Sequence, residues 1–252
     1  MDKKRSLTWR VQMAGPLENV VAVVTGASSG IGEATAMTLA DLGARVALLA
    51  RRRDRLEALS AKLGTDRALA IEADVTDPGS VNEAVAAVVA ATGRIDVLVN
   101  NAGTGVTGPI EGGDVAQWKA MVDVNLLGVL HCTQAALPHL LQAAEGPRGV
   151  ADVVTISSVA GRMAGPPYGV YAATKHAVGA FSEALRKEVA GRRVRVGLVE
   201  PGMVQTELTT DTPRTDFEWL RPTDVADAVS YLVTRPRGVA VHELLVRPTQ
   251  QL

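Results

Sequence analysis

Short apolar runs alternate with longer amphipathic stretches along most of this 252-residue chain. Residues 20–24 are only valine and alanine, which predicts a strand buried on both faces, because such strands show no polar alternation. We expect further strands at 45–50, 68–72, 96–99, 153–157, 195–199 and 243–246. Helical periodicity covers 30–42, 53–63, 77–92, about 115–134 with a continuation to about 144, and 169–189.

Strands that alternate with helices predict one α/β domain, a Rossmann fold with a doubly wound, seven-stranded parallel sheet flanked by helices. Residues 13–252 should form this domain, because no linker, repeat or low-complexity stretch divides them. Residues 1–12 are basic and polar and lack the apolar stretch of a secretion signal. We predict that they form a disordered N-terminal extension.

Composition narrows the possible classes of protein. The 26 basic and 27 acidic residues are interspersed, and the net charge of −1 provides no field that would attract nucleic acid or a membrane. No apolar run reaches the roughly 18 residues of a membrane span. The single cysteine, Cys132, excludes an intramolecular disulfide and favours a cytoplasmic location. The four histidines lack metal-ligand spacing, so no metal site is predicted.

A glycine-rich turn, Thr25-Gly26-Ala27-Ser28-Ser29-Gly30-Ile31-Gly32, follows the first strand and opens the first helix. Glycines in this place let the backbone approach a pyrophosphate, and the helix N-terminus offers free N–H groups to the phosphates. The alternative is that these glycines serve only the turn. We predict a dinucleotide site that includes Gly26, Ser28, Ser29, Gly30, Ile31 and Gly32.

The end of the second strand indicates which dinucleotide binds. An acidic residue there would accept a hydrogen bond from the 2′-hydroxyl of NAD, but the chain reads Ala50-Arg51-Arg52-Arg53. Arginine can pair with a 2′-phosphate in a bidentate fork. We therefore predict NADP(H), with Arg51 as the main contact and Arg52 as the second candidate. Arg53 is expected to be a solvated start of the next helix.

Tyr171 and Lys175 lie four residues apart in a predicted helix, so both side chains can point into one site. A free phenol has a pKa of about 10, and a nearby ammonium favours the phenolate. We expect Lys175 to lower the pKa of Tyr171 toward the value that general acid–base catalysis needs. Ser158 lies thirteen residues before Tyr171 (171 − 158 = 13). Strand alternation allows only one of Ser157 and Ser158 to face the site.

These features together resemble the short-chain dehydrogenase/reductase family from about residue 17 onward. Three further segments carry the resemblance: Asn100-Asn101-Ala102-Gly103, Val124-Asn125-Leu126-Leu127-Gly128 and Pro201-Gly202-Met203-Val204-Gln205-Thr206. Within the family, the chain is most similar to NADP-preferring bacterial hydroxy-acid and ketone reductases of the clavulanic acid dehydrogenase type. The resemblance implies reversible hydride transfer between NADP(H) and a ketone or aldehyde and the corresponding alcohol.

The resemblance also implies a role for each catalytic residue. Tyr171 would be the general acid/base, and Lys175 would lower its pKa and bind the nicotinamide ribose. Ser158 would stabilise the substrate oxygen, and Asn125 would hold a water that links Lys175 to solvent. The remaining cofactor contacts implied by the family are Asp74 and Val75 at the adenine, Asn101, Ala102 and Gly103 along the cofactor, and Pro201, Gly202, Val204 and Thr206 near the carboxamide.

The family further implies a homotetramer or homodimer. The helices at 115–134 and 169–189 would form an interface through Met121, Val122, Leu126 and Val129 on the first and Ala172, Ala173, Ala177 and Ala180 on the second. Such an interface would be self-complementary about a two-fold axis.

Two other functions remain open for a chain with this fold. One is a non-catalytic dinucleotide sensor, although sensors of this type usually lack the tyrosine or the lysine. The other is an epimerase or dehydratase, which is usually longer. Met163, Tyr168 and Met203 are expected to be walls of the substrate pocket, whereas Trp219 either covers a ligand or packs internally. No cluster of basic residues is placed to receive a substrate carboxylate.

Overall fold

The computed structural model describes residues 15–210, 212 and 216–251, so the predicted N-terminal extension 1–12 lies outside the described residues. A seven-stranded sheet forms the centre, with the strand order β3-β2-β1-β4-β5-β6-β7 and every pair parallel. Its strands are β1 (Val21–Thr25), β2 (Arg45–Ala50), β3 (Ala68–Glu72), β4 (Val97–Asn100), β5 (Ala151–Ile156), β6 (Val194–Pro201) and β7 (Glu243–Val246). The predicted fold class is confirmed, and strand boundaries differ by at most two residues.

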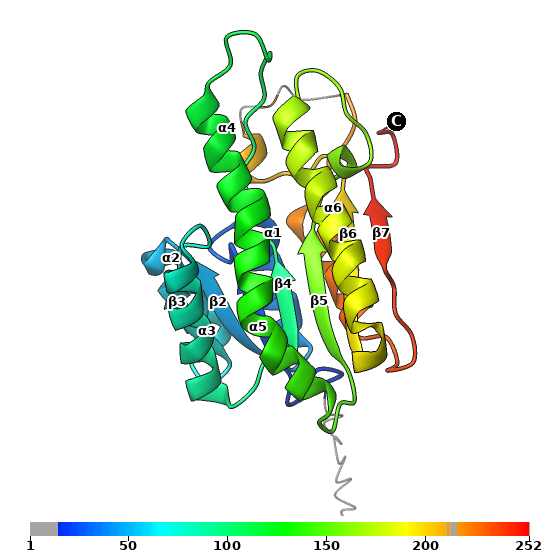
Figure 1. The fold of residues 1–252 in the computed structure, drawn as a ribbon. Helices are drawn as coiled ribbons and strands as arrows, with labels where there is room; N and C mark the ends of the chain where they lie inside the picture. The colour runs from blue at the N-terminus through cyan, green and yellow to red at the C-terminus, as the bar shows by residue number, and fades with distance from the viewer. Residues whose placement is uncertain (1–14, 211, 213–215, 252) are drawn as a thin grey trace, which may run out of the picture.

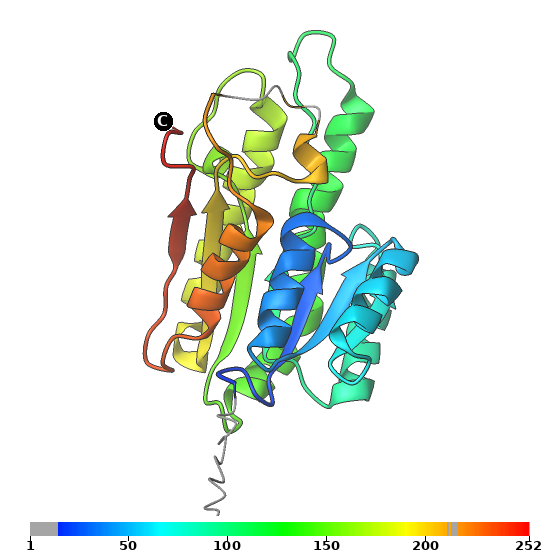
Figure 2. The same cartoon turned by 180° about the vertical axis from the view of Figure 1, so that it is seen from behind.

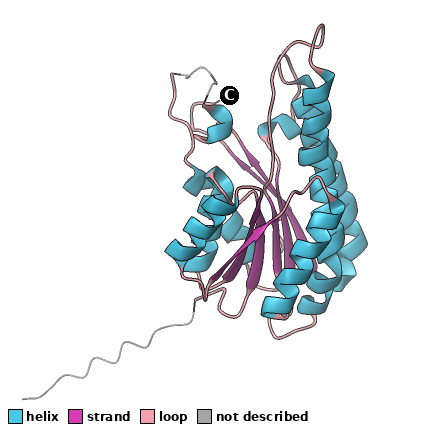
Figure 3. Ribbon diagram, turned by 90° about the vertical axis from the view of Figure 1, so that its left-hand side faces the viewer, coloured by secondary structure: helices cyan, strands magenta, loops and turns pink. Residues whose placement is uncertain are grey.

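Helices cover both faces of the sheet (Figure 3). One face carries α3 (Pro78–Thr92), α4 (Val115–Val122), α5 (Gly128–Ala144) and α6 (Gly169–Val189), as Figure 1 shows. The other carries α1 (Gly30–Asp41), α2 (Arg53–Leu63) and α7 (Pro222–Val233), seen from behind in Figure 2. Each face buries its own core of mainly alanine, valine and leucine, which follows from the low aromatic content of 3%.

Helix α7 was missing from the sequence prediction, which expected a lid at about 205–221 and assigned no element between that lid and the strand at 243–246. The signal was present, because Pro222 occupies the first helical turn and Val225, Val229 and Leu232 recur at helical spacing. These three side chains are buried against α1 and the sheet. The helix therefore completes the second face of the sheet and limits the lid to the residues before it.

The predicted helix at 115–144 is one rod with a change of winding in the middle. Between α4 and α5, Asp123–Leu127 form a π-helical turn, a feature often found at functional sites. By length and composition this rod is the one helix in the described part of the chain that could cross a membrane, with a mean hydropathy of 1.3. Only 39% of that apolar window is buried, which leaves an apolar surface on the rod.

The sheet order places the site. Chain direction across the sheet reverses between β1 and β4, because β2 and β3 lie on one side of β1 and β4 to β7 lie on the other. Loops at the carboxyl ends of β1 and β4 diverge at such a switch point and leave a crevice between them. The glycine turn follows β1, and Asn101 to Gly103 follow β4, so both border this crevice.

Candidate active site

A cavity of about 710 Å³ runs along the carboxyl ends of the strands. All but two of the predicted site residues line it, and the exceptions are Gly32 and Asn125. The cavity therefore joins the glycine turn, the ends of β2 and β4, and the helix that carries Tyr171 into one continuous space. This volume lies within the range typical of pockets for small molecules and cofactors.

The glycine turn fits a dinucleotide because side chains are excluded there. Gly26 has a φ of +65°, a left-handed conformation that favours glycine. A Cβ on Gly32 would lie 2.3 Å from the Gly26 carbonyl oxygen, so helix α1 can approach the turn only with glycine at that position. Ser29 is the N-cap of α1, but its side chain does not cap the helix. The first-turn N–H groups thus lack that partner, as a phosphate site requires.

Asn101 ties the glycine turn to the loop after β4. Its Nδ2 donates to the Thr25 carbonyl at 2.9 Å and to that of Gly26 at 3.3 Å. Thr25 Oγ1 accepts from the backbone N–H groups of Asn101 and Ala102, both at 3.0 Å. The Asn101 side chain thus holds together two walls of the cavity, a positioning role that the sequence did not reveal.

Arg52, more than Arg51, faces the glycine turn. Its Nε and Nη2 donate to Ser28 Oγ at 3.1 and 2.9 Å, and Nη2 also donates to Ser29 Oγ at 2.7 Å. Arg51 lines the same end of the cavity with an exposed side chain. Sequence spacing could not rank the two arginines, because the twist at the end of β2 decides which one turns toward Ser28.

Asp74 and Val75 line the cavity just beyond β3, and their predicted contact with the adenine stays a prediction. Asp74 Oδ1 accepts from the backbone N–H of Thr76 at 2.9 Å and from its hydroxyl at 2.8 Å. These hydrogen bonds, the backbone one foremost, lower the pKa of Asp74. The carboxylate is therefore charged at neutral pH and can accept a hydrogen bond from a ligand.

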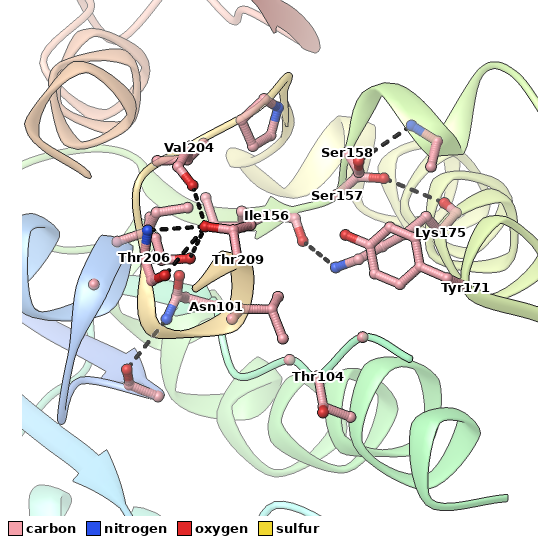
Figure 4. A pocket seen from close by; sticks show the side chains of 18 of the residues that line it. Asn101, Thr104, Ile156, Ser157, Ser158, Tyr171, Lys175, Val204, Thr206 and Thr209 are labelled. Atoms are coloured by element: carbon pink, nitrogen blue, oxygen red, sulfur yellow. Dashed lines mark hydrogen bonds between the residues drawn. The ribbon is translucent and has the colours of Figure 1, made fainter. Parts of the chain in front are cut away.

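Ser158, Tyr171 and Lys175 meet at the other end of the cavity (Figure 4). The Ser158 side chain lies close enough to the Tyr171 phenol to lower its pKa, by favouring the ionised form. Lys175 Nζ donates to the Ile156 carbonyl at 3.0 Å and lies 5.7 Å from the centroid of the Tyr171 ring. Helix α6 presents the tyrosine and lysine on one face, and the loop after β5 brings the serine to them.

The pKa expected for Tyr171 is corrected by this geometry. Burial raises the pKa of the phenol above its ordinary value, and the Ser158 side chain offsets only part of this effect. Burial also lowers the pKa of Lys175 to about 8, because the charged ammonium loses its hydration. The ammonium of Lys175 was expected to lower the pKa of Tyr171. This effect does not outweigh burial, since the ammonium is directed to the Ile156 carbonyl. The phenol is thus protonated at neutral pH.

The two neighbouring serines have different roles. Ser157 Oγ donates to the Lys175 carbonyl at 3.2 Å and so fastens helix α6 to the end of β5. Ser158 Oγ accepts from the Ala160 N–H at 3.1 Å and faces Tyr171. Both serines line the cavity, so the prediction that only one of them can face the site is wrong, and they differ in their hydrogen-bond partners.

Asn125 lies behind the cavity wall, in the π-helical turn. Its Oδ1 accepts from the Thr104 N–H at 2.8 Å, and its Nδ2 donates to the Thr104 carbonyl at 2.8 Å and to Thr174 Oγ1 at 3.1 Å. Both N–H groups of this amide are engaged, so the side chain clamps the Thr104 loop to α6. The water link predicted for Asn125 stays a prediction.

Arg162 supports the loop that carries Ser158. Its Nε donates to Glu200 at 2.5 Å, and its Nη2 donates to Glu243. Glu200 is almost fully buried at the end of β6, and burial raises its pKa, which the Arg162 hydrogen bond partly offsets. The guanidinium thereby ties the Ser158 loop to both β6 and β7.

The sequence reasoning missed several lining residues, among them Glu207, Thr209 and Gln251. Thr209 Oγ1 donates to the Val204 carbonyl at 2.7 Å and accepts from the Thr206 N–H at 3.1 Å. Gln251 Oε1 accepts from the Met203 N–H at 2.9 Å. A short turn that begins after Thr206 could have been recognised from the threonine spacing, whereas Gln251 carries no local signal.

The pocket walls predicted for the substrate are present, because Met163, Tyr168 and Met203 all line the cavity. Trp219 is partly buried and is not among the lining residues of the cavity. Cys132 is buried in α5, and burial raises the pKa of its thiol to about 12. Among the described residues, no group of histidine, cysteine and acidic side chains is arranged to hold a metal ion.

The cavity lies where a parallel, doubly wound sheet binds its ligands, and comparison with known proteins gives the family. Residues 20–216 match the short chain dehydrogenase family. The chain belongs to this family. An uncharacterised oxidoreductase of Staphylococcus epidermidis is 40% identical over 228 residues, which span 90% of this chain and 96% of that protein. One of Staphylococcus aureus strain USA300 is 38% identical over 232 residues, or 92% and 98% of the two chains.

Solved structures of this family hold nicotinamide dinucleotides. An alcohol dehydrogenase of the archaeon Thermococcus sibiricus, complexed with 5-hydroxy-NADP, superimposes with a TM-score of 0.84 at 32% identity and covers 92% of this chain and 98% of its own. A 3-ketoacyl-(acyl-carrier-protein) reductase of Brucella melitensis, complexed with NADH, has a TM-score of 0.85 at 30% identity, with 94% and 100% covered. These two structures support a nicotinamide dinucleotide as the cofactor. They do not settle whether it carries a 2′-phosphate, because one is complexed with 5-hydroxy-NADP and the other with NADH.

Proposed function

We propose that this protein is an NADP(H)-dependent oxidoreductase that reversibly transfers hydride between the nicotinamide and a ketone or aldehyde and the corresponding alcohol. The observation that carries the proposal is the convergence of Ser158, Tyr171 and Lys175 at one end of a cavity whose other end is the glycine turn. The cofactor, when bound, supplies or accepts the hydride. The protein positions the reactants and moves the proton.

The residues that would hold the cofactor follow from the cavity. The N-terminus of α1 with Gly26, Gly30 and Ile31 would bind the pyrophosphate, and Asp74 and Val75 would border the adenine. Asn101, Ala102 and Gly103 would lie along the cofactor, and Pro201, Gly202, Val204 and Thr206 would lie near its carboxamide, since all of them line the cavity. Gly32 contributes by allowing α1 to approach, since it does not line the cavity.

Tyr171 is the proton donor in carbonyl reduction. Because burial keeps the phenol protonated at neutral pH, it is ready to donate to a carbonyl oxygen as negative charge develops there. The Ser158 hydroxyl stabilises the same oxygen by a second hydrogen bond. Lys175, with a pKa of about 8, carries a positive charge at neutral pH that favours the tyrosinate left after proton transfer. This arrangement favours reduction at neutral pH, and alcohol oxidation is expected to accelerate as pH rises.

The substrate end of the cavity favours an uncharged, largely apolar carbonyl compound. Its described lining consists of glycines, threonines and apolar side chains such as Met163, Tyr168 and Leu208, and Lys175 is the one charged group among these described residues. A carboxylate would therefore lack a cation beyond the one used for catalysis. The proposed likeness to reductases of the clavulanic acid dehydrogenase type stays a prediction, and the lining argues against a hydroxy-acid substrate.

A substrate panel tests the reaction. Purified protein would be assayed with aliphatic and aromatic ketones, aldehydes, keto acids and the corresponding alcohols, each with NADPH or NADH, by the absorbance of the reduced nicotinamide. Turnover of uncharged ketones or aldehydes with NADPH is the expected outcome. Binding of NADPH without turnover of any carbonyl or alcohol would favour the sensor instead, and turnover of keto acids alone would contradict the apolar pocket.

Cofactor choice gives a prediction with two variants. Arg52→Ala should weaken NADPH about tenfold to a hundredfold, because a charge-assisted hydrogen bond contributes ~1.5–3 kcal/mol. The affinity for NADH should change little, since NADH lacks the 2′-phosphate. Arg51→Ala should act in the same direction but less, because its side chain is more exposed than that of Arg52. Fluorescence titration of each variant with NADPH and NADH measures both effects. Equal losses for the two cofactors would assign the arginines to structure.

A homotetramer, or at least a homodimer, is supported by the apolar surface of the α4–α5 rod and by the family. The residues expected at its interface need revision, because Met121, Val129 and Ala172 are buried within one chain. Ala173 and Ala180 of α6 and Leu127 of the rod remain exposed and are the better candidates. A cytoplasmic location is consistent with the single, buried Cys132 and stays part of the proposal.

The assembly can be tested by light scattering coupled to size exclusion. We expect a mass two or four times the 26.4 kDa of one chain. Leu127→Glu should lower that mass, because Leu127 is 38% exposed in one chain and would be buried against a partner. A fully active wild-type protein that elutes as a monomer would refute the assembly.

A further inference from the structure

Glu207 connects the substrate side of the cavity to the arginines beside the glycine turn. It begins the short helical turn Glu207–Thr209, directly after Thr206. Its Oε2 accepts from Arg52 Nη1 at 2.8 Å, and its Oε1 accepts from Arg55. The carboxylate therefore crosses the cavity from the segment after β6 to the start of α2, some 150 residues away in sequence.

The carboxylate occupies donors that a 2′-phosphate would need. A guanidinium has five N–H donors. Arg52 donates from Nε to Ser28, from Nη2 to both Ser28 and Ser29, and from Nη1 to Glu207. Four of its five N–H donors are therefore engaged. A phosphate beside Ser28 and Ser29 can pair with Arg52 in a bidentate manner only if it replaces one of these partners.

We infer that Glu207 is a specificity-determining residue that competes with the 2′-phosphate of NADP(H) for Arg52 and so weakens the preference for NADP(H) over NAD(H). The inference rests on the proposed function, because it assumes a dinucleotide in this cavity. Glu207 is the replaceable partner, because its side chain is 54% exposed and can move to water. Ser28 and Ser29 lie in the rigid glycine turn and remain with the arginine.

The state of charge supports this competition. Hydrogen bonds from Arg55 and Arg52 lower the pKa of Glu207 to about 2, so the side chain is a full negative charge at any pH at which the protein would be studied. A carboxylate and a phosphate both seek the same fork of N–H groups. Replacing the carboxylate by an amide removes the repulsion and leaves Arg52 available.

The experiment measures binding of two adenosine fragments by calorimetry. Adenosine 2′,5′-bisphosphate carries the 2′-phosphate and AMP does not. Glu207→Gln should tighten the bisphosphate about twofold to fivefold, the range for an exposed ion pair, and leave AMP unchanged. The same selective gain should appear for NADPH over NADH in fluorescence titrations. In the background of Arg52→Ala, Glu207→Gln should have no effect, because the shared partner is absent.

Glu57→Gln is the matched control. Glu57 lies on the same helix as Arg55, pairs with Arg53 at 2.8 Å and is 57% exposed, so its loss changes the charge equally without touching Arg52. This substitution should leave the affinities for the bisphosphate and for AMP unchanged. Three results would overturn the inference. They are tighter binding of the bisphosphate by Glu57→Gln as well as by Glu207→Gln, an equal gain in affinity for AMP in Glu207→Gln, and weaker binding of the bisphosphate by Glu207→Gln.

Failure of the inference is distinguishable from failure of the proposed function. If NADPH binds and supports turnover while Glu207→Gln leaves all affinities unchanged, the inference is wrong and the function stands. If neither NADPH nor NADH binds the wild-type protein, the proposed function fails as well. Binding of NADH alone, with no gain for the bisphosphate in Glu207→Gln, would refute both the competition and the NADP(H) assignment.

Discussion

Replacing Tyr171 by phenylalanine is expected to lower the rate of carbonyl reduction about 10²- to 10⁴-fold, the usual contribution of a positioned general acid. In the proposed function the phenol is the proton donor at the substrate end of the cavity, where Ser158 lies beside it. The effect should fall on kcat, because the hydroxyl is used in the transition state and contributes little to holding the cofactor. NADPH affinity should change little.

Tyr231→Phe provides the control for loss of a phenol. Tyr231 lies on α7, is 47% exposed and stacks on Arg235, 3.9 Å from the ring centroid, away from the cavity. It should retain wild-type turnover. The measurement is steady-state kinetics of both variants with the best ketone of the substrate panel. A Tyr171→Phe variant that keeps most of the wild-type kcat would eliminate this residue as the acid.

Lys175→Met is expected to be nearly inactive and more stable than the wild type. Activity falls because the positive charge that favours the tyrosinate is lost, and we expect a decrease in kcat of about 10² or more. Stability rises because a buried ammonium is replaced by an apolar side chain of similar length. The lowered pKa of about 8, against an ordinary 10.5, measures the cost of that burial. At 1.36 kcal/mol per pKa unit, and after loss of the hydrogen bond to Ile156, the net gain is about 2 kcal/mol.

The pH dependence gives this second prediction its sign. The folded-state pKa of Lys175 is below its unfolded value, so the unfolded chain binds the proton more tightly. The destabilisation is complete below about pH 8, decreases between 8 and 10.5, and vanishes above that range. Thermal unfolding should therefore show Lys175→Met about 4–8 °C above the wild type at pH 7, with the gap narrowing in alkali.

Lys187→Met is the control for this measurement, because Lys187 lies on the same helix, is 68% exposed and pairs with Glu183. Its melting temperature should follow that of the wild type at every pH. If Lys175→Met were less stable than the wild type at pH 7, the hydrogen bond to the Ile156 carbonyl would outweigh the cost of the buried charge.

The sheet was predictable because each strand is a short, mainly apolar run between turns, a pattern that depends on local sequence alone. Helix α7 was missed because no element was assigned after the lid expected at about 205–221, although Pro222 marks its start. The convergence of Tyr171, Lys175 and Ser158 followed from spacing and resemblance. The direction of the Tyr171 pKa did not, since it depends on how deeply the phenol is buried, and burial is a property of the packed fold.

Contacts between distant segments were the least predictable part of the site. Arg52 and Glu207 are 155 residues apart, and no periodic pattern links them. Asn101 carries a family motif, but its amide is used to join two backbone loops. The prediction that Met121 and Val129 lie at a subunit interface also failed, because both side chains are buried within one chain.

The turn Glu207–Thr209 has a consequence for how this protein can evolve. Glu207 faces the arginines beside the glycine turn, while Leu208 approaches the substrate end, 3.7 Å from where a Cβ on Gly105 would stand. If the proposed function holds, neighbouring residues of one short turn would thus contact two different ligands. Selection for a bulkier substrate through Leu208 will shift the backbone of Glu207 and change cofactor preference at the same time. Laboratory evolution of this chain should therefore screen every new substrate with both NADPH and NADH.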